Sequence, residues 1–159
     1  MRGVDRGFSQ YLDRTTFPLI LNEADGARSM SLKMPRAGEP VLMNGAEYLV
    51  PVIGLDCLGQ PLGPESLFRW ELVSGTLEWK LGDILDPEMA AGILLHPEGV
   101  CRDWVPGTEI IPYINKMDSQ ADDHAAHSLA EAVLRNRNFP VKRVVMGSVQ
   151  NTRATCLVG

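Results

Sequence analysis

Residues 109–118 read EIIPYINKMD, a short apolar run that ends in the pattern N-K-x-D. Apolar runs of this length are typical of strands buried on both faces, as in a parallel sheet. The residues that follow predict a helix, which begins at Ser119 or Asp122 and reaches about Asn138, because small and apolar side chains recur on one face. The stretch therefore predicts a strand, a polar loop and a helix in succession.

Three other short apolar runs predict strands, at residues 17–22, 48–55 and 141–146. Prolines at positions 18, 51 and 112 remove hydrogen-bond donors and predict irregularities within these strands. Asp86 followed by Pro87 predicts the start of a second helix, ending near His96. We also expect a short helix over residues 66–73, an extra strand over 77–81 and a long irregular segment over 26–46. The alternation of strands and helices in the second half predicts an α/β fold with a mostly parallel sheet.

The composition bounds the class of protein. The 159 residues suit one domain, and 45% hydrophobic residues are enough for a sizeable core. The net charge of -5, without any basic stripe, argues against a nucleic-acid partner. The longest apolar run is too short to cross a membrane. Three cysteines without close spacing predict reduced thiols rather than disulfides or a zinc site, so we expect a cytoplasmic protein.

The N-K-x-D pattern is the one with which GTPases recognise guanine, and it follows a predicted strand. The carboxylate of Asp118 can accept two hydrogen bonds from the N1 and N2 donors of guanine. The stem of Lys116 can lie over the purine ring, and Asn115 can tie the loop to its neighbours. The alternative is purely structural: Asp118 caps the following helix and Asn115 forms a turn.

A second pattern lies at residues 19–26, which read LILNEADG. An apolar strand that ends in acidic residues and glycine resembles a Walker B segment. Asp25 and Glu23 are the candidate catalytic carboxylates, Asp25 is the candidate Mg²⁺ ligand, and the amide of Gly26 can approach a γ-phosphate. The alternative is an ordinary turn built on Asp25 and Gly26.

A third pattern, Gly147-Ser148, follows the predicted strand over 141–146. In GTPases the loop at this place contacts the base through backbone amides. In a parallel sheet, ligands bind beyond the carboxyl ends of the strands, where all three patterns lie.

The phosphate-binding pattern G-x-x-x-x-G-K-[ST] is absent, because the sequence contains no Gly-Lys dipeptide. Only 16 residues precede Phe17, and we expect this segment, 1–16, to be poorly defined. We therefore expect a P-loop NTPase-like domain over residues 1–159 whose first strand and P-loop are missing. The gap in the sheet should leave an exposed edge that favours pairing between chains, so we expect a homodimer.

Several further motifs accompany these patterns: NEADGAR at 22–28, LKMP at 32–35, EP at 39–40, VIGLDCLGQPL at 52–62, Arg69, Gly99 and residues 144–149. Together with INKMD at 114–118 they resemble the selenium-dependent hydroxylase accessory protein family (YqeC) over residues 17–150. The pair E-A-D-G-x-R and L-K-x-P-x-x-x-E-P carries most of this specificity.

The resemblance implies a P-loop NTPase-like three-layer sandwich and a role in maturing molybdenum hydroxylases that depend on selenium. It also implies that Lys33, Glu39 and Arg69 line the site. Asp56, at the end of a predicted strand, is a further site-lining candidate, or it caps the turn that follows it. Family members carry a G-x-G-G-K-T-type loop, and this sequence departs from them there. We therefore expect weak or absent nucleotide hydrolysis.

Three hypotheses follow. The first is a nucleotide-binding accessory protein that takes GTP or GDP with Mg²⁺ and acts on a hydroxylase-maturation partner. The second is a non-enzymatic remnant of the fold that binds a partner protein or a molybdopterin-type ligand. The third is a metal or selenium chaperone that uses thiols such as Cys57. His124 and His127, three apart on a predicted helix, fit a solvated helix start better than a metal site.

Overall fold

The computed structural model describes residues 7, 11, 15–73, 79–118 and 122–159. The elements in chain order are β1 (Tyr48–Leu49), β2 (Val52–Gly54), 3-10 helices at Leu55–Cys57 and Trp70–Leu72, α1 (Pro87–Leu94), β3 (Glu109–Ile110), β4 (Tyr113–Asn115), α2 (Asp122–Arg135), β5 (Arg143–Ser148) and β6 (Arg153–Val158). Most of residues 1–16, predicted to be poorly defined, lie outside the described residues.

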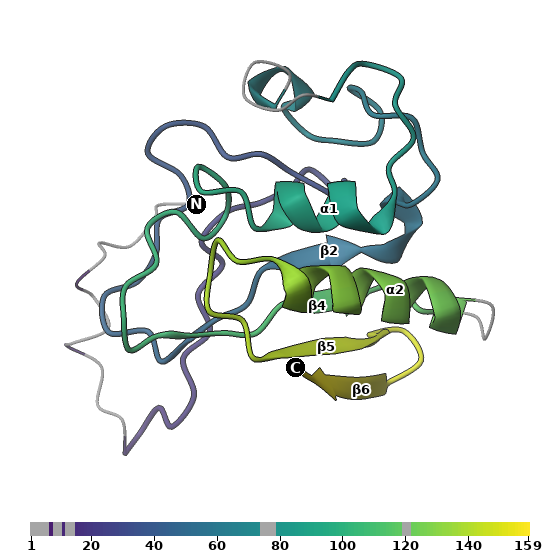
Figure 1. Cartoon of the computed structure of the whole chain (residues 1–159). Coiled ribbons are helices and arrows are strands. Elements are labelled where there is room, and N and C mark those ends of the chain that lie inside the picture. The colour runs from purple at the N-terminus through teal and green to yellow at the C-terminus, as the bar shows by residue number, and fades with distance from the viewer. Residues whose placement is uncertain (1–6, 8–10, 12–14, 74–78, 119–121) are drawn as a thin grey trace.

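The strands form a four-stranded sheet in the order β2-β4-β5-β6 (Figure 1). Strands β1 and β3 form a separate two-stranded sheet. The pairs β1–β3, β2–β4 and β4–β5 are parallel, and β6 is antiparallel to β5. The predicted α/β class with a mostly parallel sheet is therefore confirmed. No helix among the described residues is both long and apolar enough to span a membrane.

Two prolines explain why β1 is separate from β2 and β3 from β4. The same register offset joins β1 to β3 and β2 to β4, which places Pro51 opposite Pro112. Proline cannot donate to the ladder, but its carbonyl still accepts. The amide of Tyr113 donates to the Pro51 oxygen at 2.8 Å, and that of Val145 donates to the Pro112 oxygen at 2.9 Å. The strands predicted over 48–55 and 109–114 are thus confirmed, with the predicted irregularity at the prolines.

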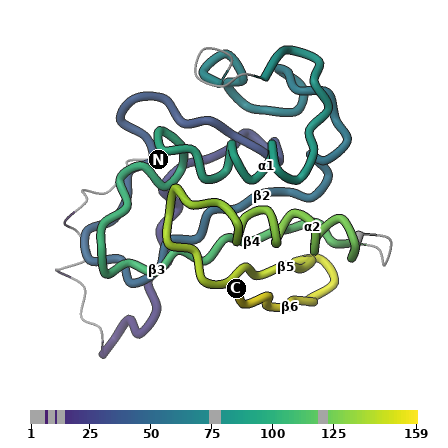
Figure 2. Tube along the Cα trace, in the orientation of Figure 1, coloured from purple at the N-terminus to yellow at the C-terminus, as the bar shows by residue number. Residues whose placement is uncertain are grey.

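Both α-helices lie side by side on one face of the sheet (Figures 1 and 2). The chain runs from β2 through α1 to β4 and through α2 to β5, always in one direction across the sheet. Right-handed crossovers that proceed in one direction place their helices on the same face. The core lies between these layers and includes Ile53, Ile114 and Met146 of the strands and Leu129 and Val133 of α2.

The described residues thus form two layers, since neither α-helix covers the opposite face of the sheet (Figure 1). A third layer would require further strands beyond β2, on the side away from β4. Crossovers toward that side would place their helices on the opposite face of the sheet. The described residues do not form that layer of the predicted sandwich.

The strand predicted over 17–22 is wrong, because this segment is unpaired and mostly exposed. Its apolar residues signalled burial, yet no strand of the described residues lies beside it. Strand β6 was not predicted, because its sequence, RATCLV, shows neither a continuous apolar run nor strict alternation. The strand predicted over 77–81 falls partly outside the described residues, and residues 79–81 are not a strand.

The helix predictions hold with shorter bounds. Asp86 caps α1 by accepting a hydrogen bond from the amide of Met89 at 2.8 Å. Helix α2 ends at Arg135, before the predicted 138, and residues 119–121 lie outside the described part. The helix predicted over 66–73 is reduced to the 3-10 turn Trp70–Leu72, because Arg69 takes a left-handed conformation with φ of 64°.

Candidate functional site at the carboxyl ends of the strands

A groove of about 1210 Å³ lies beside residues 48–52 of β1 and β2. Residues 17–27 and 42–52 supply most of its lining, and we call this cavity the edge groove. Six of the predicted site residues line it: Glu23, Asp25, Gly26, Lys33, Asn115 and Lys116. The acidic segment at 22–26 and the loop after β4 are therefore brought to one cavity, although about 90 residues separate them in sequence.

The loop after β4 is tied to the end of β5. Asp118 accepts a hydrogen bond through Oδ1 from the Ser148 hydroxyl at 2.6 Å. The amide of Met117 donates to the Gly147 carbonyl at 3.1 Å, and the Oδ1 of Asn115 accepts from the amide of Val149 at 3.5 Å. The structure thus gathers the predicted base-contacting residues, because the carboxyl ends of neighbouring parallel strands meet at one edge.

Asp118 remains available to a ligand. Its side chain is exposed, and its Oδ2 has no hydrogen-bond partner among the described residues. Helix α2 begins four residues later, at Asp122, and the side-chain contact of Asp118 is made to Ser148. These observations favour a ligand-facing carboxylate over the helix-capping alternative.

Gly147 and Ser148 lie within strand β5 rather than in a loop. Gly147 pairs with Ala154 of β6, and a Cβ at this position would collide with the carbonyl of Arg153. Ser148 is buried and holds the Asp118 carboxylate. The glycine is therefore explained by packing against β6, and the serine by its contact with Asp118.

Lys116 follows β4 in a left-handed conformation, with φ of 69°. Its Nζ donates to the Ser31 hydroxyl at 2.6 Å and to Asp56 Oδ2 at 2.8 Å, and the Ser31 hydroxyl donates to Asp56. Gly54 makes room for this group, because a Cβ there would lie 2.5 Å from Ser31 Oγ. Partial burial raises the pKa of Asp56, but the hydrogen bonds from Lys116 and Ser31 outweigh burial and hold that pKa below its ordinary value. Sequence reasoning missed Ser31, because no pattern marks it within the irregular segment.

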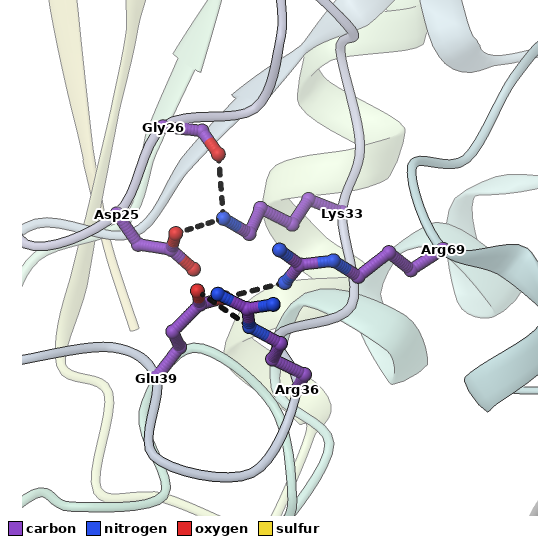
Figure 3. A network of polar contacts seen from close by, with 6 residues as sticks. All are labelled: Asp25, Gly26, Lys33, Arg36, Glu39 and Arg69. Carbon is purple, nitrogen blue, oxygen red and sulfur yellow. Dashed lines mark hydrogen bonds and ion pairs between the residues drawn. The ribbon is translucent and has the colours of Figure 1, made fainter.

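A second polar cluster lies around Lys33 (Figure 3). The Lys33 side chain is only 6% exposed, forms an ion pair with Asp25 and donates to the carbonyl of Gly26 at 2.6 Å. The Oδ2 of Asp25 is buried and has no hydrogen-bond partner among the residues that the structure describes. A buried lysine requires such a partner, so Asp25 and Lys33 fix each other.

Glu39 joins the same region by binding two arginines (Figure 3). It pairs with Arg69, and Arg36 Nε donates to its Oε1 at 3.0 Å. The hydrogen bond from Arg69 holds the pKa of the Glu39 carboxyl below its ordinary value. The guanidinium of Arg69 also lies over the Phe68 ring, 4.6 Å from its centroid, and Lys33 lies 5.7 Å from the same centroid.

The described residues do not fit a preformed Mg²⁺ site. They contain no group of three or more His, Cys, Asp or Glu side chains placed to hold a metal. The ammonium of Lys33 already neutralises Asp25, and Glu23 is exposed on the groove wall.

The thiol hypothesis is disfavoured by burial. Burial raises the pKa of the Cys57 thiol to about 12, and that of Cys101 also to about 12. Thiolates are the nucleophiles and metal ligands, so neither side chain is poised for such chemistry near neutral pH. Cys156, on β6, is exposed.

Comparison with known proteins places these residues in context. A family model described as "YqeC protein" matches residues 1–71. The protein named "Uncharacterized protein YqeC" of Escherichia coli (strain K12) is 26% identical over 139 residues, which cover 87% of this chain and 53% of the relative. The chain thus spans about half the length of the curated relative that it matches. No solved structure matches the chain. The predicted resemblance to the YqeC family is therefore confirmed.

Proposed function

We propose, from the similarity to the YqeC protein and from the edge groove, that the chain binds a guanine nucleotide as part of an accessory protein for the maturation of selenium-dependent molybdenum hydroxylases. One observation carries the nucleotide proposal: Asn115 and Lys116 line the same groove as Asp25, Gly26 and Lys33. Two of the base-side candidates and three of the phosphate-side candidates therefore face one cavity, and Asp118 lies outside the lining of this cavity. The accessory role rests on the family resemblance.

The base end of the proposed site is built around Asp118. Its free Oδ2 can accept from guanine, while Ser148 holds Oδ1 and limits rotation of the carboxylate. Lys116 lies against Asp56 and Ser31, so its stem is fixed before any base arrives. This arrangement supports recognition of guanine, which presents two adjacent donors, over adenine.

The phosphate end supports binding rather than hydrolysis. Lys33 lies at the groove, and its ammonium already pairs with Oδ1 of Asp25, whose Oδ2 is buried. We therefore propose no hydrolytic step for Asp25 or Glu23. The P-loop NTPase-like sandwich is proposed as the fold of the complete site, supported by the parallel order β2-β4-β5 with helices α1 and α2 as its crossovers.

The second candidate is a non-enzymatic module that binds a partner protein or a molybdopterin-type ligand. The edge along residues 48–52, where no other strand of the described residues pairs, favours the partner-protein form of this function. The two candidates differ in what they predict for Asp118, because only nucleotide recognition requires its carboxylate.

Calorimetry with GDP and XDP, each with Mg²⁺, tests the proposal on the wild type and on Asp118→Asn. We expect weak binding of GDP, with a Kd above micromolar, and weaker binding of XDP by the wild type. An amide at position 118 can donate to the additional oxygen of xanthine, so the preference should reverse in Asp118→Asn. Loss of a charge-assisted hydrogen bond corresponds to about a tenfold change or more in affinity for GDP.

Asp123→Asn serves as the matched control, because Asp123 is an exposed aspartate that pairs with Arg153 away from the groove. It should retain the wild-type preference. An unchanged preference for GDP in Asp118→Asn would reject the base-reading role, and GDP binding with a Kd of micromolar or below would reject the expected weakness.

A further inference from the structure

Three cations surround the ring of Phe68. The guanidinium carbon of Arg28 lies 5.2 Å from the ring centroid, and that of Arg69 lies 4.6 Å from it. The Nζ of Lys33 lies 5.7 Å from the same centroid. All three distances are within the range of about 6 Å over which an aromatic ring attracts a cation. The two guanidinium carbons are therefore at most 9.8 Å apart, which is the sum of their distances from the centroid.

Ion pairs extend this group, and its charges do not balance. Lys33 pairs with Asp25, while Arg36 and Arg69 share Glu39 (Figure 3). We call the whole group the Phe68 cluster, and its charged members are Arg28, Lys33, Arg36, Arg69, Asp25 and Glu39. Four cations and two carboxylates leave two positive charges, in a chain whose net charge is -5. Each carboxylate of the cluster already has a cationic partner, so the surplus remains for an anion from outside.

Arg28 supplies the unpaired charge. Its side chain is exposed and forms neither an ion pair nor a hydrogen bond with the residues that the structure describes. Arg69 donates to Glu39 through Nη1, and its other guanidinium nitrogens donate to none of the described residues. A guanidinium carries five N–H donors in a planar fork that matches the oxygens of a phosphate or a carboxylate. Both arginines therefore keep donors for an anion that comes to the ring.

The same two arginines share an unfavourable backbone conformation. Arg28 has a φ of 49° and Arg69 has a φ of 64°, both in the left-handed region. Arg28 lies in a tight turn in which the amide of Met30 donates to the carbonyl of Ala27 at 2.9 Å. Glycine or asparagine adopts this conformation at lower cost than arginine. Strained residues of this kind concentrate at ligand sites, so arginine at both positions is explained by its side chain rather than by its backbone.

We infer that the Phe68 cluster binds the terminal phosphate of a small phosphorylated molecule, with Arg28 and Arg69 as the hydrogen-bond donors. A phosphate monoester carries a charge of about -1.5 to -2 at pH 7, which matches the surplus of two positive charges better than the single charge of a carboxylate does. Arg28, Phe68 and Arg69 lie outside the lining of the edge groove, so the inference does not rest on recognition of a base. Lys33 belongs to both the cluster and the groove. The phosphate of a nucleotide is therefore one source of this group, and a separate phosphate ester is the other.

Methyl phosphate is the probe, and a heteronuclear NMR titration at neutral pH is the readout. We expect saturable binding to the wild type with a Kd of about 1 mM or below, as two charge-assisted hydrogen bonds provide. Arg28→Gln should raise the Kd about tenfold or more, because it removes a charge and its donors without removing an ion pair from the described fold. Arg28→Lys keeps the charge but loses the planar fork, so its affinity should be intermediate.

Two controls separate a built site from general attraction to positive charge. Arg137→Gln is the matched variant, because Arg137 is also exposed and makes no ion pair with a described residue. It should bind methyl phosphate as the wild type does. Acetate, which carries one charge, should bind the wild type about tenfold more weakly than methyl phosphate or less. The NMR spectra report whether each variant is folded.

Absence of methyl phosphate binding to the wild type, or equal binding by a folded Arg28→Gln, overturns the inference. An equal loss in Arg137→Gln, or equal affinity for acetate, overturns it as well. A GDP titration assigns the source: weaker GDP binding by Arg28→Gln supports the phosphate of a nucleotide, and unchanged GDP binding supports a separate ester. Methyl phosphate carries no base, so loss of GDP binding alone overturns the proposed function and leaves the phosphate site in place.

Discussion

Two of the four lysines in the chain, Lys33 and Lys116, line the edge groove, and a carboxylate holds each of them. The gathering of Asn115, Lys116 and Asp118 could be predicted, because a polar loop after a parallel strand always lies at the carboxyl edge of the sheet. The contacts of Ser31 and Phe68 could not be predicted. Both belong to irregular segments whose paths depend on long-range contacts, such as the hydrogen bond from the Gly54 amide to the Ser31 carbonyl at 2.9 Å.

At the scale of one side chain, Glu39 makes stability depend on pH. Its pKa is lowered in the folded state by Arg69, so its stabilising contribution is fully present above the ordinary glutamate pKa. The contribution is lost as the pH falls through the lowered, folded-state value. Glu39→Gln should cost about 1 kcal/mol at pH 7, and it should remove part of the stability that the wild type loses on acidification.

Urea unfolding at pH 7 measures the stability cost of Glu39→Gln. The same measurement at acidic pH gives the free energy of unfolding that each protein loses on acidification. Glu98→Gln is the control, because Glu98 is exposed and its side chain makes no ion pair with a described residue. If Glu39→Gln lost as much free energy of unfolding on acidification as the wild type, the ion pair with Arg69 would not be the cause.

The exposed cysteine should react faster with thiol reagents than the two buried cysteines. A thiol-specific chromogenic reagent should modify Cys156 rapidly in the native protein, because Cys156 is exposed. Cys57 and Cys101 should react only on unfolding, because burial removes access and raises their pKa to about 12. Cys156→Ser should abolish the fast phase. A fast phase that survives in this variant would show that a buried thiol is accessible.

At the scale of elements, the apolar run at 48–55 succeeded as a strand prediction, and the run at 17–22 failed. Both runs are apolar, but only the first has a neighbouring strand, with Tyr48 pairing to Glu109. Apolarity predicts burial, whereas a strand also requires a partner for its backbone. Strand β6 shows the converse. Most of its residues are exposed, yet all six pair with β5, from the pair Arg153–Ser148 to the pair Val158–Arg143.

The pairing of β5 with β6 depends on one glycine. Gly147→Ala would place a methyl group against the Arg153 carbonyl and the Ala154 Cα of β6. Backbone atoms cannot move aside as a flexible side chain can, so we expect a loss of about 1–3 kcal/mol in the free energy of unfolding, measured with urea. The displacement of the backbone should also reach Asp118. Ser148, which directly follows Gly147, donates a hydrogen bond to Oδ1 of Asp118.

Gly26→Ala is the matched control for this substitution. Its Cβ would meet only Glu23 Oε1, at 3.6 Å, which is an ordinary contact. Equal stability of the two alanine variants would show that β6 does not pack against Gly147 as described.

At the scale of the whole molecule, the one-directional order β2-β4-β5 explains both the two layers and the open edge. The α/β class and the resemblance to the YqeC family could be predicted from patterns spread along the sequence. The third layer of the predicted sandwich could not be predicted in the same way. Whether helices cover the second face of the sheet depends on which strands lie beyond β2. Pairing between chains remains a prediction, and sedimentation velocity of the wild type tests it.

Pro51 and Pro112 stand at the same level of adjacent strands, so two successive ladders each lack an amide donor along one line. We expect the sheet to be weakest along this line, between the pair β1–β3 and the pair β2–β4, because each ladder lacks one hydrogen bond there. A rotation about this line would change the width of the groove beside β1 and would leave the hydrogen bonds near Asn115, and the loop that carries Asp118, in place.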